Sequence, residues 1–190
     1  MPPDDKEIKT MVRQDGTYPS LPLKKETISV AIAQTRVNGV DGKNPAKDIK
    51  RNLDYMLECI DIAQGYGGRS DLICFHEFPI VGFSNWSREE HYKIAIDVPG
   101  PETEKIGQKC QDYGCYIVFG TYAKDPDWPD HILHLMVLMG PDGNVIAKHW
   151  KQRNVRGLFP GSEQYTSAIY DVYDRFIEMY GEDAVIPIAK

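Results

Sequence analysis

The feature that most constrains the fold is a short apolar run that ends in two ionisable residues. In residues 70–83, S-D-L-I-C-F-H-E-F-P-I-V-G-F, apolar Leu72–Phe75 precede His76 and Glu77, and Pro79 breaks the pattern. A short apolar run between polar and Pro/Gly residues is typical of a strand buried on both faces. A carboxylate at the end of such a strand lies where α/β sheets usually carry their chemistry. We predict that burial raises the pKa of Glu77 and suits it to accept a proton near neutral pH.

The patterning on either side of this run predicts alternating strands and helices. Residues 28–34 form a second strand-like run, and apolar residues recur at helical spacing from Asp48 to about Tyr66. The remaining predicted elements are a surface excursion with some helix over 86–96, a helix over 101–113, strands over 115–120, 131–139 and 144–149, a helical face over 165–180 and the start of a strand over 184–189. The order β-α-β-α-β-β-β-α-β predicts an α/β protein with a mixed sheet.

Charge and hydropathy exclude several classes of partner. The net charge of −6 argues against nucleic acid, because a phosphate-binding surface needs clustered Lys and Arg. No apolar run approaches the roughly 18 residues of a membrane span, and the N-terminus is charged rather than signal-like. Residues 1–27 are polar and proline-rich and are predicted to form an N-terminal arm, whereas residues 28–190 are predicted to form one domain. We therefore predict a cytoplasmic protein with no nucleic-acid or membrane partner.

Two motifs resemble those of the nitrilase, or carbon–nitrogen hydrolase, superfamily. One is Glu77 in F-H-E-F-P-I-V-G-F, after the second predicted strand, and the other is G-N-V-I-A-K-H-W-K, a hairpin strand that ends at Lys151. The resemblance extends from about Ile28 to Lys190 and is closest to the amidase and nitrilase branches. It implies an α-β-β-α sandwich for residues 28–190 that is incomplete at its carboxyl end. Without the resemblance, Glu77 would be interpreted as hydrated or paired with Arg, and Lys151 as a surface lysine.

The resemblance also implies a reaction, the hydrolysis of a non-peptide C–N bond in a small amide or nitrile by a Glu-Lys-Cys triad. Glu77 would be the general base that takes the cysteine proton, and Lys151 would stabilise the tetrahedral intermediate. The cysteine would form a thioester acyl-enzyme that water clears. This chemistry implies neither a metal nor an organic cofactor. The alternative is a catalytically inactive interaction or assembly module of the same fold.

The sequence offers no convincing nucleophile. The cysteine of the family is expected beyond Lys190, after a hairpin that residues 185–189 would open. The four cysteines lack C-x-x-C spacing and are interpreted as reduced, structural thiols: Cys59, Cys74, Cys110 and Cys115. Cys74 is the strongest rival, but it lies three residues before Glu77, so strand alternation places it on the opposite face. We therefore expect the nucleophile from beyond residue 190 or from a companion chain that carries the C-terminal half, with a split, cleaved, truncated or degenerate chain as the possible origins.

Other features depart from the family pattern or allow a second interpretation. Trp150 stands where the family usually has Arg, and Arg156 precedes G-L-F-P-G where the amidase branch has an auxiliary acid. His131 and His134 lie three apart in a strand and so face opposite sides, which makes them a poor metal pair. Three further residues are expected to be structural, with proton relay as the alternative for His76 and pocket lining as the alternative for Tyr122 and Trp128. Lys148 is expected to be solvated, because it points away from the side that Lys151 faces. Members of the family commonly pair through surface helices, so the resemblance also implies a homo-oligomer.

Overall fold

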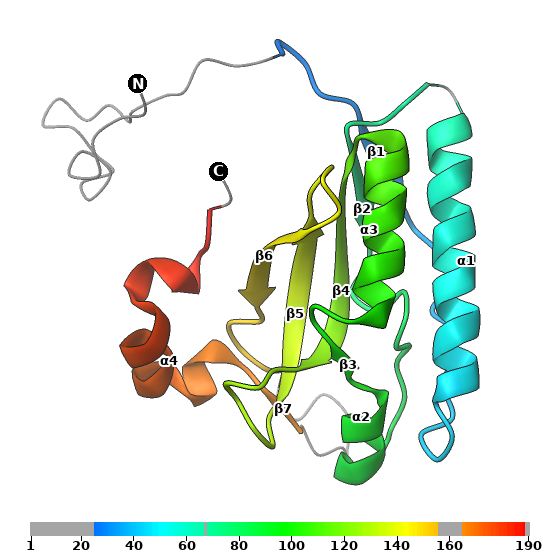
Figure 1. Cartoon of the computed structure of the whole chain (residues 1–190). Coiled ribbons are helices and arrows are strands. Elements are labelled where there is room, and N and C mark those ends of the chain that lie inside the picture. The colour runs from blue at the N-terminus through cyan, green and yellow to red at the C-terminus, as the bar shows by residue number, and fades with distance from the viewer. Residues whose placement is uncertain (1–24, 67, 156–164, 189–190) are drawn as a thin grey trace, which may run out of the picture.

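The computed structural model describes residues 25–66, 68–155 and 165–188, and these residues build one mixed sheet with helices packed on it (Figure 1). The strands run in the order β1-β2-β4-β5-β6, with β3 paired to β4 and β7 paired to β5. The strands are β1 (Val30–Ala33), β2 (Leu72–Phe75), β3 (Ile96–Asp97), β4 (Tyr116–Lys124), β5 (Ile132–Met139), β6 (Val145–Trp150) and β7 (Thr166–Ser167). The helices are α1 (Ala46–Gly65), α2 (Arg88–Ile94), α3 (Pro101–Tyr113) and α4 (Tyr173–Tyr180), with 3-10 turns η1 (Ile169–Asp171) and η2 (Glu182–Val185).

Strand direction divides the sheet into two parts. β1, β2 and β4 are parallel, which requires the crossover helices α1 and α3, whereas β4, β5 and β6 are antiparallel neighbours. The β5–β6 connection is the tight turn predicted from Pro141-Asp142-Gly143, and Gly143 has the positive φ (84°) that such a turn requires. This topology brings the carboxyl ends of β2 and β6 to the same region of the molecule.

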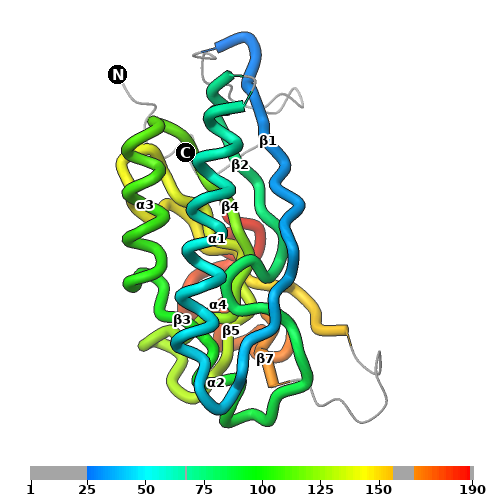
Figure 2. The backbone as a smooth tube through the Cα atoms, turned by 90° about the vertical axis from the view of Figure 1, so that its right-hand side faces the viewer, coloured from blue at the N-terminus to red at the C-terminus, as the bar shows by residue number. Residues whose placement is uncertain are grey.

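Helices α1 and α3 cover one face of the sheet and enclose the core (Figure 2). Alternate residues of the strands point into this layer and are buried: Ile73, Phe75, Ile117, Phe119, Leu135 and Val137. The helices pack on these strand residues with the apolar face that the helical spacing predicts, which includes Leu53, Met56, Ile60 and Ile106. α3 begins at Pro101, whose missing N–H costs nothing at a helix start, and ends at Gly114 in the left-handed conformation (φ 63°).

The opposite face of the sheet, here called the outer face, keeps apolar side chains open to solvent. The register aligns Val30, Leu72 and Tyr116 in one row, and Ile32, Cys74, Val118 and Leu138 in the next. Val30, Ile32 and Tyr116 are 44%, 78% and 43% exposed. Contiguous exposed apolar surface of this kind typically marks a place where other polypeptide packs.

Most predicted elements are confirmed, and the carboxyl-terminal ones are corrected. Residues 184–188 form no strand, because Val185 ends the η2 turn and Pro187 has no N–H to donate to a ladder. The helical face predicted over 165–180 is a helix only in α4 and the short 3-10 turn η1, because side chains bind the backbone of the earlier residues. Asn154 donates to the Thr166 carbonyl, and Asp171 accepts from Ala168 N–H, and such bonds compete with helix formation.

Trp150, where the family usually has Arg, anchors α4 to the sheet. Its ring is buried and packs at 5.1 Å from Trp128 and 5.3 Å from Phe176 of α4. Trp128 donates its indole N–H to the Tyr180 hydroxyl at 2.9 Å. Trp128 is therefore a packing residue rather than a pocket wall. The predicted arm 1–27 is described only from residue 25, and the G-L-F-P-G segment and Arg156 lie outside the described residues.

Candidate active site

Glu77 and Lys151 meet in space at the ends of two strands. Glu77 lies two residues after β2, and Lys151 directly follows β6. The Lys151 Nζ donates to Glu77 Oε1 at 2.8 Å. Their side chains are 32% and 46% exposed, so the pair is held by the fold and still reached by solvent. The structure thus brings together the two residues that the motifs singled out, while their catalytic roles stay predictions.

His134 is a third member of this cluster, although its spacing in the sequence suggested only a poor metal pair with His131. Its Nε2 lies 2.9 Å from Glu77 Oε1, and its backbone carbonyl accepts the Lys151 N–H at 2.8 Å. The β5–β6 register pairs Leu135 with Trp150, so Lys151 follows directly opposite His134. The register shifts by one residue between Leu138 and Met139, so a regular hairpin predicted from the turn alone does not give this pairing.

The backbone of Glu77 rests against β4 at a glycine. Gly120 N–H donates to the carbonyl of His76 at 3.1 Å. A Cβ on Gly120 would overlap the Glu77 carbonyl oxygen and sit against its Cα. Only glycine therefore allows this close approach of the Glu77 segment to the sheet.

Aromatic side chains surround the cluster. Tyr122 lies next to it on β4, with its ring 5.1 Å from the His134 ring and 4.9 Å from that of Phe78. Phe78 also stacks on His134 at 5.2 Å and contacts Phe83 at 5.4 Å. Tyr122 is only 5% exposed, so it packs as the wall of the site rather than standing free in it. These rings bury His134, the residue that contacts Glu77.

The predicted pKa shift of Glu77 is wrong in direction. The largest influence on the pKa of this carboxyl is the hydrogen bond from His134, which lowers it. Burial raises the pKa, whereas the hydrogen bond and the charge of Lys151 lower it further. The net result is a fall in the pKa of Glu77 from 4.5 to about 2. Burial alone would raise the pKa, but two donors that favour the charged form outweigh it. Burial, and after it the Glu77 carboxylate charge, raises the pKa of the Tyr122 hydroxyl. Both donors contact Oε1 of Glu77, and no hydrogen bond from the described residues reaches Oε2.

The neighbouring His76 has partners of its own. Its Nε2 lies 2.8 Å from the Thr35 hydroxyl, and its Nδ1 accepts the Phe78 N–H at 3.2 Å. Burial lowers the pKa of His76. The neutral ring therefore links Thr35 to the backbone of Phe78 and fixes the turn after β2. This agrees with the structural role expected for His76 from the sequence.

The four cysteines are free thiols, and their environments disfavour the thiolate. Burial is the largest influence on each and raises the pKa of Cys59, Cys74 and Cys115, and that of Cys110 to about 12. A nucleophilic cysteine needs a lowered pKa. This supports the prediction that none of the four is the nucleophile.

Two polar side chains near the motifs have structural partners. Lys148, expected to be solvated, is ion-paired with Asp125 at 2.9 Å, and the Asp125 side chain is mostly buried. His131 Nδ1 lies 2.7 Å from the Ser167 hydroxyl and so ties β5 to β7. Across the described ranges, no group of three or more His, Cys, Asp or Glu side chains is placed to hold a metal ion. In those same ranges, no helix is long and apolar enough to cross a bilayer.

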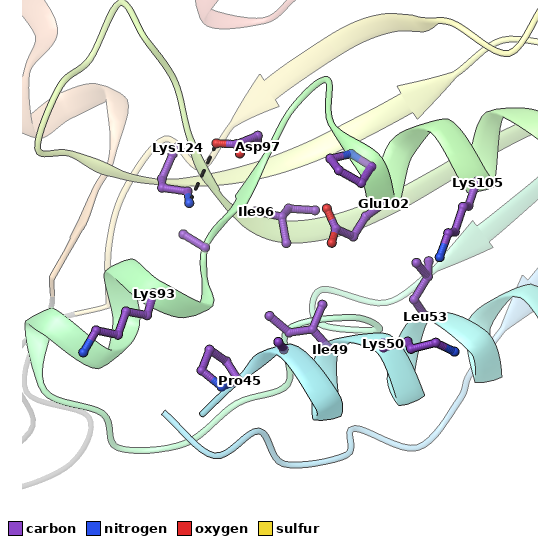
Figure 3. Close-up of a pocket in the computed structure, with 13 residues that line it drawn as sticks. Pro45, Ile49, Lys50, Leu53, Lys93, Ile96, Asp97, Glu102, Lys105 and Lys124 are labelled. Atoms are coloured by element: carbon purple, nitrogen blue, oxygen red, sulfur yellow. Dashed lines mark ion pairs between the residues drawn. The ribbon is translucent and has the colours of Figure 1, made fainter. Parts of the chain in front are cut away.

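A hollow of about 310 Å³ opens elsewhere, between the first turns of α1 and α3 and the β3 strand (Figure 3). Four lysines line it, Lys50, Lys93, Lys105 and Lys124, together with Asp97, Glu102 and apolar residues of the helix layer. Lys50, Lys93 and Lys124 each have a carboxylate within 4 Å. Glu77, His134 and Lys151 do not line this hollow, so we do not assign the site there.

His91 on α2 is a buried imidazole beside the cluster. Ser87 and Glu90 cap the start of α2 reciprocally, which holds the His91 ring 4.2 Å from that of Tyr122. His91 is 8% exposed, and its Nε2 has no hydrogen-bond partner among the described residues. Burial and the nearby His134 lower the pKa of His91 from 6.5 to about 4.

This shift predicts a loss of stability in mild acid. The folded state disfavours protonated His91, so its contribution is fully present above pH 6.5 and disappears as the pH falls from 6.5 towards 4. The shift corresponds to about 3 kcal/mol in the free energy of unfolding. Urea unfolding between pH 7 and 4.5 should show a steeper loss for the wild type than for His91→Phe. Equal slopes for the wild type and His91→Phe would contradict the prediction.

Comparison with known proteins places these features in a family. The family model described as carbon-nitrogen hydrolase matches residues 29–186. A formamidase from Bacillus cereus is 31% identical over 107 residues, which cover 55% of this chain and 31% of that protein. A formamidase from Bacillus anthracis is 29% identical over the same shares. The chain therefore spans about a third of the length of the curated relatives that it matches.

Solved structures agree on the fold. An N-terminal amidase with a Gln-Gly peptide matches with a TM-score of 0.56 and 18% identity over 68% of this chain and 28% of that one. The Caenorhabditis elegans NitFhit protein matches with a TM-score of 0.57 and 17% identity over 74% and 33%. A carbon–nitrogen hydrolase from Helicobacter pylori matches with a TM-score of 0.53 and 12% identity over 74% and 44%.

Proposed function

The chain belongs to the carbon–nitrogen hydrolase family, and we propose that it supplies the base and the lysine for hydrolysis of a small amide. The observation that carries the proposal is the 2.8 Å contact between Lys151 Nζ and Glu77 Oε1. A carboxylate and an ammonium at one solvent-reached point can handle a proton and a developing negative charge. The formamidase and amidase names of similar proteins favour an amide over a nitrile.

In the proposed mechanism, a cysteine thiol gives its proton to Glu77 Oε2 while its sulfur bonds to the amide carbon. The carbonyl electrons move to oxygen, and the Lys151 ammonium stabilises that oxyanion. As the ammonium turns from Glu77 to the oxyanion, one cause of the low Glu77 pKa weakens, so the carboxylate becomes more basic at the step where it takes the proton. The C–N bond then breaks as Glu77 passes the proton to the amine, and water hydrolyses the thioester.

The nucleophile is proposed to come from beyond residue 190 or from a companion chain. The raised pKa values of all four thiols support this, because none is activated. The outer face supports it as well, since Val30, Ile32 and Tyr116 offer exposed apolar surface on which a second sheet could pack. The homo-oligomer and the cytoplasmic location stay predictions. The same inactive thiols favour a second candidate, a catalytically silent assembly module of this fold.

One experiment separates the two candidates. The protein is purified with its natural partners by a tag on the native gene and is incubated with formamide, longer aliphatic amides and the matching nitriles. We expect ammonia release from an amide, together with one cysteine that iodoacetamide modifies and substrate protects. Mass spectrometry then identifies the polypeptide that carries it. A homogeneous 21.6 kDa species with no turnover and no substrate-protected cysteine would support the assembly module.

A further inference from the structure

His134 joins the two proposed catalytic side chains through both its ring and its backbone. Its Nε2 lies 2.9 Å from Glu77 Oε1, and its carbonyl accepts the Lys151 N–H at 2.8 Å. The Lys151 ammonium donates a hydrogen bond to the same Glu77 oxygen at 2.8 Å. The contacts form a closed cycle through three residues, so a shift of any one residue disturbs the other two.

Packing fixes the orientation of the His134 ring. The residue is 6% exposed, and its ring stacks on Phe78 (centroids 5.2 Å apart, planes at 29°) and lies 5.1 Å from the Tyr122 ring. Phe78 directly follows Glu77, so the residue that clamps the imidazole also sets the direction of the carboxylate chain. A donor locked by packing loses little rotamer freedom when it binds, which is how a preorganised site is held in place.

The charged and titratable groups around His134 explain what the ring does. Glu77 and Lys151 face it from the strand ends, while Tyr122 and the neutral His91 pack beside it from β4 and α2. Both donors bind Oε1, and among the described residues no hydrogen bond reaches Oε2, so Oε2 is the carboxylate oxygen that can accept a proton from a ligand or thiol.

We propose that His134 is a positioning residue that holds Glu77 by Oε1 and so presents Oε2 to the nucleophile. The inference rests on the proposed function for its catalytic consequence, but the hydrogen bond itself can be tested without any turnover. It assigns His134 a role that a packing residue would not have, because a packing residue does not control the proton affinity of its neighbour.

The test is a pH titration of the Glu77 carboxyl by carbon-13 NMR in the intact protein. We expect a midpoint near 2 in the wild type and a midpoint displaced upwards, towards 4.5, in His134→Leu, which keeps apolar volume but removes the donor. His134→Gln, whose amide N–H can reach the position of Nε2, should titrate below His134→Leu. The matched control His131→Gln removes a histidine that contacts Ser167 instead, and it should titrate like the wild type.

An unchanged Glu77 midpoint in His134→Leu would overturn the inference. If that variant does not fold, nitrogen-15 spectra of the wild-type imidazole decide the question, because the inference requires a proton on Nε2 and a ring protonated only on Nδ1 overturns it. In a complete, active enzyme, His134→Leu should lower kcat with little change in KM. If Glu77 titrates as expected in the wild type and the variants but the complete assembly, purified with its partners, shows no turnover, the proposed function is refuted and the His134 assignment stands.

Discussion

Replacing Glu77 with glutamine is expected to lower kcat for amide hydrolysis by roughly 10³-fold, within the range of 10²–10⁴ that general acid–base catalysis contributes. The glutamine keeps the size of the side chain and can still accept a hydrogen bond, so the fold should persist. It cannot take the cysteine proton, so the acylation step loses its base. The measurement is ammonia release by the complete enzyme, with folding followed by circular dichroism.

Glu89→Gln is the matched control for this substitution. Glu89 is an exposed acid on α2 that pairs with Lys93, so its loss should leave kcat unchanged. Wild-type turnover by Glu77→Gln would remove the general-base role of Glu77 and, with it, the mechanism proposed above.

Replacing Lys151 with methionine is expected to lower kcat by roughly 10²–10³-fold, the usual effect of removing one group that stabilises an oxyanion. The methionine keeps most of the aliphatic stem, so packing beside β6 should be retained. The ammonium also lowers the Glu77 pKa by hydrogen bonding and by charge, so its loss should raise the pKa of Glu77. A kcat profile against pH and the titration of Glu77 measure the two effects separately.

Lys148→Met is the control for this second prediction. Lys148 lies three residues earlier, on β6, and its ammonium pairs with Asp125 rather than Glu77. The control should retain wild-type kcat. A Lys151→Met enzyme with unaltered kcat would show that the ammonium lies beside the reaction without taking part in it.

The sequence was sufficient for most of the elements and pointed to the two residues, Glu77 and Lys151, that meet in space, because periodicity and turn residues are local signals, while the catalytic roles of the two residues stay predictions. The hairpin turn at residues 141–143 and the α3 boundaries at Pro101 and Gly114 were predicted in this way and are confirmed. The extended prediction for residues 184–189 failed at Pro187, because apolar composition was given more weight than the missing N–H.

The properties of the site that were missed depend on contacts between distant strands. Burial of Glu77 could be foreseen from its apolar surroundings, but the two donors that reverse its pKa shift arrive from β5 and the end of β6. His134 was considered only against His131, its neighbour in the chain, whereas its relevant neighbours are Glu77 and Lys151. Local patterns carry no information about a partner that a sheet brings from more than 50 residues away.

The β5–β6 hairpin has an evolutionary consequence. The pairing of Leu135 with Trp150 makes the number of residues in this hairpin part of the site, because side chains alternate between faces along a strand. The register already shifts once, between Leu138 and Met139. Beyond that irregularity, gain or loss of a single residue before Lys151 would reverse the parity of β6 and direct the Lys151 ammonium away from the carboxylate. Insertions in descendants of this protein should therefore accumulate in other loops, and the span from 135 to 150 should keep its length.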